Sequence, residues 1–211
     1  MITVTLIDKT IIKYNTFEEI IDYCKHQIVK LDCSHNDLTT LPDSISNLIN
    51  LKYLNCRFNQ LTFLPDSIGN LINLKGLYCS NNQLTLLPES IGNLINLEVL
   101  ECFNNKLTLL PESIGKLINL GELYCHDNEL TLLLESIGNL IHLQYFYLYN
   151  NKIKELPETI INLKNIIRFC KDEFILTPQQ EKYFDWIKSN KSYEFDEYVD
   201  MVMVKCAYYG V

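Results

Sequence analysis

A period of 23 residues constrains the fold of this chain more than any other feature of its sequence. Six consecutive blocks share the pattern LxxLxCxxNxLxxLPxxIxxLxN, and a seventh, partial block breaks down after Phe169. The six blocks begin at Ile28, Leu51, Leu74, Leu97, Leu120 and Leu143. One block cannot bury its apolar positions alone, so successive blocks must stack to form a core. The sequence therefore predicts one continuous solenoid.

The positions of the block predict a strand, a turn and a short helical segment. Apolar and other residues alternate around the fourth position, which indicates a short strand that pairs in parallel with its neighbours. These strands are expected to centre near Leu31, Leu54, Leu77, Leu100, Leu123 and Phe146. The ninth position is asparagine in all six blocks, and its side chain is expected to bond backbone groups in a stacked ladder. A Leu-Pro pair then begins a segment such as PDSIGNL, which is long enough only for a helical turn or a 3₁₀ piece.

The block pattern resembles that of leucine-rich repeat proteins, in particular the 23-residue intracellular class related to Ras-group proteins, over residues 28–169. This resemblance implies an α/β solenoid, a horseshoe with a parallel concave sheet and short helical or 3₁₀ convex turns. The departures from the pattern are few: Leu134 replaces proline, Leu148 replaces cysteine, and Ser46 and Ile161 replace glycine. The near identity of successive blocks, with cysteine in place of leucine, also resembles the leucine-rich repeat proteins of giant viruses such as mimivirus.

Five of the eight cysteines occupy the sixth position of successive blocks, namely Cys33, Cys56, Cys79, Cys102 and Cys125. Leu148 occupies this position in the last block, which indicates an apolar core site. A zinc site needs four converging ligands, which a linear row does not provide. Neighbouring strands hold their Cβ atoms about 4.8 Å apart, beyond the usual range of about 3.5–4.5 Å for a disulfide. The row therefore predicts buried, reduced thiols and a cytoplasmic, reducing environment.

The two ends of the chain do not follow the repeat, and both are expected to cover the ends of the stacked core. Residues 1–27 predict an N-terminal cap, formed by a hairpin that turns at Asp8 and a helix whose N-cap is Thr16. Residues 170–211 predict a helical C-terminal cap whose helix has Thr177 as its N-cap. The apolar surface of this second helix is assigned to Tyr183, Phe184, Trp186 and Ile187. The last residues favour neither helix nor strand.

The sequence contains no phosphate-binding loop and none of the HExxH, CxxC or GxSxG motifs. His126 beside Asp127 resembles half of a catalytic dyad, but no nucleophile is placed to complete it. Cys206 could serve a catalytic tail like that of the bacterial ubiquitin ligases that carry leucine-rich repeats, whose catalytic domain is far larger than this tail. We therefore expect no enzyme activity, no cofactor and no metal site.

The charge and hydropathy of the chain bear on its partners. The formal net charge is -8, which disfavours nucleic acid and anionic membrane surfaces. No apolar run reaches about 18 residues, and the N-terminus lacks the basic region of a secretory signal. We expect a monomer that binds a partner protein, and a protein of a host cell is one candidate for that partner.

Aromatic residues at the strand positions that leave the core are the candidate binding residues. The predicted site is centred on Tyr124, Tyr145, Tyr147 and Tyr149, flanked by Phe103 and His126, with Tyr53 and Tyr78 further along the sheet. Exposed tyrosines favour protein interfaces, and the alternative is cross-strand stacking that only steadies the sheet. Solvated carboxylates nearby, Glu101, Glu122, Asp127 and Glu129, favour a basic partner.

The predicted function is a non-catalytic protein–protein interaction scaffold that binds its partner on the concave face. The alternatives are a substrate-recognition subunit of an enzyme such as a ubiquitin ligase, or a repeat product with little specific role. Two further apolar rows either pack between turns or form a second contact face. One comprises Ile49, Ile72, Ile95, Ile118 and Ile141, and the other comprises Phe63, Leu86, Leu109 and Leu132.

Overall fold

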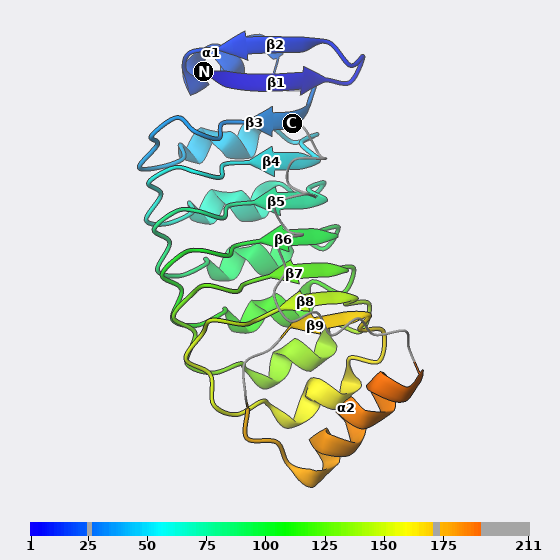
Figure 1. Cartoon of the computed structure of the whole chain (residues 1–211). Helices are drawn as coiled ribbons and strands as arrows, with labels where there is room; N and C mark the ends of the chain where they lie inside the picture. The colour runs from blue at the N-terminus through cyan, green and yellow to red at the C-terminus, as the bar shows by residue number, and fades with distance from the viewer. Residues whose placement is uncertain (25–26, 171–173, 191–211) are drawn as a thin grey trace.

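The computed structural model describes residues 1–24, 27–170 and 174–190. Within these ranges, nine strands form one sheet in the order β2-β1-β3-β4-β5-β6-β7-β8-β9, and short 3₁₀ segments lie behind it (Figure 1). The strands are β1 Ile2–Leu6, β2 Ile11–Tyr14, β3 Ile28–Asp32, β4 Tyr53–Asn55, β5 Gly76–Tyr78, β6 Val99–Glu101, β7 Glu122–Tyr124, β8 Tyr145–Tyr147 and β9 Arg168–Cys170. The α-helices are α1 Phe17–Cys24 and α2 Pro178–Asn190. The 3₁₀ segments are η1 Asp43–Asn47, η2 Asp66–Asn70, η3 Glu89–Asn93, η4 Glu112–Lys116, η5 Glu135–Asn139 and η6 Glu158–Asn162.

The seven strands from β3 to β9 pair in parallel, and equivalent repeat positions stand opposite one another. Leu31 pairs with Leu54, Leu54 with Leu77, and the series continues in the same register to Phe169. The fourth-position side chains from Leu31 to Phe146 are at most 1% exposed. These pairings confirm the predicted parallel strands and the solenoid architecture.

The asparagine ladder forms as predicted and links each repeat to the one before it. The Asn59 side-chain amide donates to the carbonyl oxygens of Cys33 at 2.9 Å and Cys56 at 3.0 Å. Its Oδ1 accepts the backbone N–H of Leu38 at 3.0 Å. The same bonds recur at each later ninth position, at Asn82, Asn105, Asn128 and Asn151. One side chain therefore satisfies backbone groups of two turns that water does not reach.

The cysteine row lies in the core. All five sixth-position cysteines are fully buried free thiols, as predicted. Four of them donate S–H hydrogen bonds to a carbonyl of the next strand, such as Cys79 to Glu101 at 3.2 Å. Burial raises the pKa of Cys56 to about 12, and a protonated thiol of this kind is a poor nucleophile. Cys206 lies outside the described residues.

Each 3₁₀ segment follows an extended residue on the side of the solenoid opposite the sheet. Five of these N-cap residues are prolines with ψ between 146° and 155°, such as Pro65. Leu134 takes the same conformation, with φ -78° and ψ 156°. Proline therefore favours this turn but is not required for it.

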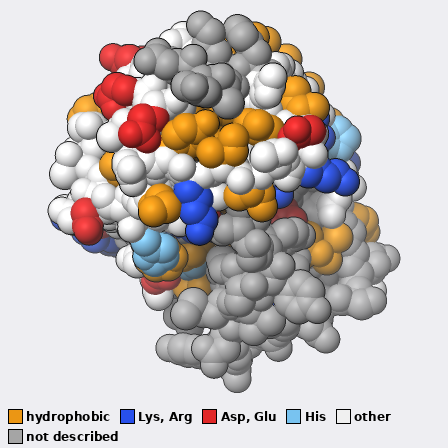
Figure 2. Space-filling view, turned by 90° about the horizontal axis from the view of Figure 1, so that it is seen from above, with side chains coloured by type: hydrophobic (Ala, Val, Ile, Leu, Met, Phe, Trp, Pro, Cys, Tyr) orange, Lys and Arg blue, Asp and Glu red, His pale blue; other side chains and the backbone are white. Residues whose placement is uncertain are grey.

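The N-terminal cap extends the sheet instead of only covering it. The predicted hairpin forms, and β1 pairs in antiparallel fashion with both β2 and β3. Thr16 caps α1 as predicted, since its Oγ1 accepts the Glu19 N–H at 3.4 Å. The cap leaves Ile7 and Ile11 exposed, and hydrophobic side chains gather on this end of the molecule (Figure 2).

Helix α2 closes the other end of the core. Thr177 is its N-cap as predicted, because its Oγ1 accepts the Gln180 N–H at 3.3 Å while the Gln180 side chain accepts the Thr177 N–H at 3.0 Å. Phe184 and Ile187 are buried, whereas Trp186 is 46% exposed and contributes less to the packing than the sequence predicts. Residues 191–211, the predicted rest of this cap, lie outside the described residues. None of the helices in the described ranges has the length and apolar character that a membrane span requires.

Candidate interaction surface

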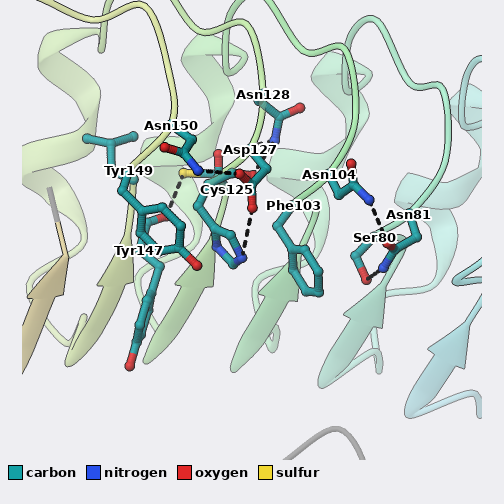
Figure 3. Close-up of polar contacts among 12 residues, drawn as sticks. Ser80, Asn81, Phe103, Asn104, Cys125, Asp127, Asn128, Tyr147, Tyr149 and Asn150 are labelled. Atoms are coloured by element: carbon teal, nitrogen blue, oxygen red, sulfur yellow. Dashed lines mark hydrogen bonds and ion pairs between the residues drawn. The ribbon is translucent and has the colours of Figure 1, made fainter. Parts of the chain in front are cut away.

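Five of the predicted site residues form two stacks of rings on the strand side of the solenoid, and the stacks meet where His126 and Tyr147 lie 6.1 Å apart in a tilted contact. We call Phe103, Tyr124, His126, Tyr147 and Tyr149 the concave aromatic cluster. The Phe103 and His126 ring centroids are 4.5 Å apart, and His126 and Tyr149 are also 4.5 Å apart. Tyr124 and Tyr147 stack at 5.0 Å on neighbouring strands. Figure 3 shows how Phe103, Tyr147 and Tyr149 lie near the ends of their strands.

The cluster is more buried than the sequence predicts. Tyr124 is 7% exposed, Tyr147 is 4% exposed and His126 is 3% exposed. The expectation that these three side chains are exposed to solvent is wrong, and the alternative of cross-strand stacking describes them better. Phe103 and Tyr149 are half-buried. Tyr145 is also half-buried, on the same strand as Tyr147 and two residues before it.

Tyr53 and Tyr78 lie apart from the cluster, each beneath a cation. The Lys30 ammonium is 5.3 Å from the Tyr53 ring centroid, and the Arg57 guanidinium is 4.4 Å from that of Tyr78. The Tyr78 ring folds back over Gly76, where a Cβ would lie 2.7 Å from the tyrosine hydroxyl oxygen. The predicted site therefore divides into a C-terminal cluster and two separate cation–aromatic pairs.

The carboxylates near the cluster already have partners within the chain. Arg57 crosses the Tyr78 ring and forms an ion pair with Glu101, which is only 8% exposed. Burial raises the pKa of Glu101, and the charge of Arg57 opposes this shift. Glu122 accepts the hydroxyl of Tyr124 at 2.7 Å. The expectation of a solvated acidic surface is therefore wrong here, because Glu101 is paired with a residue from two repeats earlier and Glu122 with a residue of its own strand.

Asp127 and Glu129 are partnered in the same way. Asn150 donates to Asp127 at 2.7 Å, and Lys152 pairs with Glu129 at 2.8 Å (Figure 3 shows the first contact). Each contact joins residues 23 positions apart, in equivalent places of adjacent repeats. The sequence predicts that the carboxylates of this face attract a basic partner. Because these carboxylates are already bound within the chain, most of that attraction is lost.

His126 is a neutral ring at the centre of the cluster. Burial lowers its pKa to about 4, while the nearby charge of Asp127 opposes this shift. Its Nε2 lies 3.7 Å from an Asp127 carboxylate oxygen, and its buried Nδ1 has no hydrogen-bond partner among the described residues. A neutral imidazole stacked between two rings is suited to packing rather than to proton transfer at pH 7.

The eighth position of each repeat has a left-handed backbone, which sequence reasoning missed. Phe58 has φ 53° there and is 47% exposed, and its ring stacks on His35 at 4.4 Å. Later repeats place asparagine or aspartate at this position, residue types that tolerate positive φ. The recurrence of Asn and Asp at one repeat position was the available signal. His35 and Phe58 are the exceptions, and Phe58 places a bulky side chain on a strained backbone.

Two family models match the chain: a leucine-rich repeat region over residues 23–132, and a leucine-rich repeat over residues 142–163. A search of curated proteins found no match. Among solved structures, a leucine-rich repeat protein of Leptospira interrogans is 29% identical with a TM-score of 0.65, covering 81% of this chain and 50% of that one. This chain thus spans half the length of the Leptospira protein.

Two other solved structures share the fold over shorter parts of their length. One is the leucine-rich repeat ectodomain of the plant membrane receptor kinase GASSHO1/SCHENGEN3 from Arabidopsis thaliana. It is 30% identical with a TM-score of 0.57, covering 60% of this chain and 16% of that one. The other is an internalin of Listeria monocytogenes, 22% identical with a TM-score of 0.54, covering 65% and 39%. With a family model matched over more than half of its residues and with this architecture, the chain belongs to the leucine-rich repeat family.

Proposed function

We propose that this chain is a non-catalytic protein-binding scaffold that contacts its partner through the concave aromatic cluster and Tyr145. The observation that carries this proposal is the stack of rings across adjacent repeats, outside the core. Folding does not require aromatic residues there. The equivalent positions of the earlier repeats hold residues such as Asn55 and Ser80 in the same backbone geometry.

The stacking gives the cluster the properties of a prepared contact surface. Rings held against one another lose little conformational freedom when a partner binds, so less of the binding energy is offset by ordering. Phe103, Tyr145 and Tyr149 supply the exposed edges, and the buried Tyr147 and His126 hold them in place. Tyrosine is favoured in protein interfaces because its ring is apolar and its hydroxyl bonds to polar groups.

A structural neighbour supports the binding of a protein by this fold. The GASSHO1/SCHENGEN3 ectodomain, 30% identical to this chain, was solved in complex with CASPARIAN STRIP INTEGRITY FACTOR 2. That partner belongs to the plant receptor. For the present chain the neighbour supports only the kind of function, which is recognition of a protein by a leucine-rich repeat solenoid.

The finer parts of the proposal rest on the sequence. The 23-residue period supports the intracellular, Ras-group-like class of repeat, and the row of free buried thiols supports a cytoplasmic, reducing location. The near identity of the repeats supports a relationship to giant-virus proteins, for which the partner would be a host protein. The net charge of -8 supports a protein partner over nucleic acid. We propose that the unbound chain is a monomer.

The test is affinity capture from cytosol with three baits. The first is the wild-type chain, and the second carries Phe103→Ala, Tyr145→Ala and Tyr149→Ala together. The third carries Ile72→Ala and Ile95→Ala, which change exposed residues away from the strands. A specific partner should bind the first and third baits and be lost from the second. If the aromatic variant keeps the wild-type circular dichroism spectrum and still captures every partner, the concave surface is not the binding site.

A further inference from the structure

A second apolar row lies beside a row of carboxylates, away from the concave aromatic cluster. The thirteenth repeat position carries Phe63, Leu86, Leu109 and Leu132, which are 39–55% exposed. Three positions later, each repeat carries an exposed carboxylate. These carboxylates are Asp43, Asp66, Glu89, Glu112, Glu135 and Glu158. A groove of about 870 Å³ runs between the two rows, lined by Phe63, Leu86, Leu109, Asp43, Asp66 and Glu89 together with the intervening prolines and buried leucines.

Folding does not account for the apolar row. The same position holds Thr40 in the first repeat and Glu155 in the sixth, both exposed, with unchanged strand register. The buried position is the next one, where Leu64 and its equivalents in the later repeats fill the core. The four apolar side chains therefore form a bounded strip that is exposed to water over the central repeats. Such a strip, bordered by polar residues, indicates an interaction site.

We propose that this groove binds an amphipathic helix of a partner protein. Its apolar side chains would lie on the row of Phe63, Leu86, Leu109 and Leu132, here called the leucine row, and its lysine or arginine side chains on the row of sixteenth-position carboxylates, here called the carboxylate row. The charges argue for a basic occupant. Among the described residues, those lining the groove include three carboxylates and no lysine or arginine. The charge of Lys116 helps to lower the pKa of Glu89, but Lys116 is not one of the residues that line the groove.

The spacing of the repeats selects a helix over an extended peptide. Adjacent strands are about 4.8 Å apart, and if the leucine row keeps this repeat spacing, four repeats span about 14 Å from its first residue to its last. A helix presents one side chain per turn on a given line, and its pitch of about 5.4 Å gives about 16 Å over three turns. Same-face residues of an extended chain are about 6.6 Å apart and would span about 20 Å. Only the helix keeps apolar and basic side chains in step with all four repeats.

Hydrogen bonds hold two of the carboxylates in place before any partner arrives. Glu89 accepts the backbone N–H groups of Glu112 at 3.2 Å and Ser113 at 3.1 Å. Glu135 accepts the N–H of Thr159 at 3.0 Å, and this bond lowers the pKa of Glu135. The carboxylates are therefore ionised at pH 7. Each keeps lone pairs that can accept a hydrogen bond from a cation.

The probe for this proposal is a fluorescent 14-residue peptide of leucine and lysine, with its leucines spaced for one face of a helix. A second peptide of the same composition alternates the two residues, and a third replaces lysine with glutamate. Fluorescence anisotropy should show binding of the first peptide only, weakened by added salt. Binding of the alternating peptide with equal affinity would overturn the proposal.

Three variants of the chain locate the binding. Leu86→Ser with Leu109→Ser, or Asp66→Asn with Glu112→Gln, should weaken peptide binding about tenfold or more. Neither Asp66 nor Glu112 accepts a hydrogen bond that holds another repeat among the described contacts. Ile95→Ser with Ile118→Ser is the control, since these isoleucines are 54% and 53% exposed on a different row, against 55% for Leu86 and 39% for Leu109. The proposal fails if the leucine pair binds like the wild type, or if the control loses as much affinity.

Two further measurements separate this site from other interpretations. The variant that carries Phe103→Ala, Tyr145→Ala and Tyr149→Ala should bind the peptide like the wild type. The groove proposal can therefore hold even if the concave-face proposal fails. Sedimentation equilibrium tests a second copy of the chain as the occupant. If the wild type dimerises and the Leu86→Ser, Leu109→Ser pair is monomeric, the groove is a self-association surface and the proposed basic helix is wrong.

Discussion

Replacing Gly92 with alanine should destabilise the solenoid, although intrinsic helix preference predicts the opposite. Gly92 lies in η3, which packs against η4 of the next repeat. A Cβ at Gly92 would lie 2.6 Å from the Ser113 Cβ and 2.7 Å from the Ser113 backbone oxygen. These atoms belong to, or are fixed to, the backbone and cannot rotate away. The two segments must therefore move apart.

The magnitude follows from two opposing effects. Alanine in place of glycine gains up to about 1 kcal/mol in a helical segment, while forced overpacking costs about 1–3 kcal/mol. The displaced group here is backbone, so we place the overpacking cost at the upper end and expect Gly92→Ala to lower the free energy of unfolding by about 1–2 kcal/mol. The matched control is Gly121→Ala, because its Cβ would lie 3.7 Å from the nearest atom, the Glu98 backbone oxygen.

Urea denaturation followed by circular dichroism measures both variants. Gly121→Ala should stay within about 0.5 kcal/mol of the wild type, whereas Gly92→Ala should unfold at lower urea concentration. If Gly92→Ala is as stable as the wild type, the spacing between 3₁₀ segments is not set by this contact. Ile161 occupies the equivalent position of the last repeat, where no further 3₁₀ segment follows among the described residues.

Three other perturbations test the core and the cluster. Because burial lowers the pKa of His126 from 6.5 to about 4, the unfolded chain binds a proton that the folded chain excludes between these values. The free energy of unfolding should therefore fall, by an amount on the order of 3 kcal/mol, as the pH drops from 6.5 to about 4, and His126→Phe should remove that part of the slope in urea titrations. Asn128→Asp should cost at least about 3 kcal/mol by the same assay, since it replaces an amide that donates to three carbonyl groups with an acceptor. Cys56, Cys79 and Cys102 should resist a thiol reagent in the native state and react within seconds in urea; rapid native labelling would contradict the buried row.

The repeat explains why so much of this fold could be predicted from the sequence. A pattern that recurs six times assigns every position of the block a role, so the strands, the asparagine ladder and the cysteine row all follow from it. The helix N-caps at Thr16 and Thr177 have local signatures. The pairing of β1 with β3 does not, because the edge that a hairpin joins is decided by contacts distant in sequence.

The candidate site was predicted only in part, for a similar reason. Period-two alternation tells which side chains leave the core, and it identified the aromatic residues of the cluster. It does not tell what each side chain meets on the next strand. Arg57 reaches Glu101 across an intervening strand, 44 positions along the chain, and Tyr147 is covered where a single strand would leave it exposed. Contacts of this kind depend on the particular residues in neighbouring repeats rather than on the repeat pattern.

Photo-crosslinking would show whether the concave aromatic cluster contacts the partner protein. A benzophenone side chain would be placed in turn at Tyr145, at Tyr149 and at Ile72, and the captured complex would be irradiated and analysed by mass spectrometry. We expect crosslinks to the partner from the two tyrosine positions and none from Ile72, which is 54% exposed on a different row. Crosslinks from Ile72 with none from either tyrosine position would contradict this expectation.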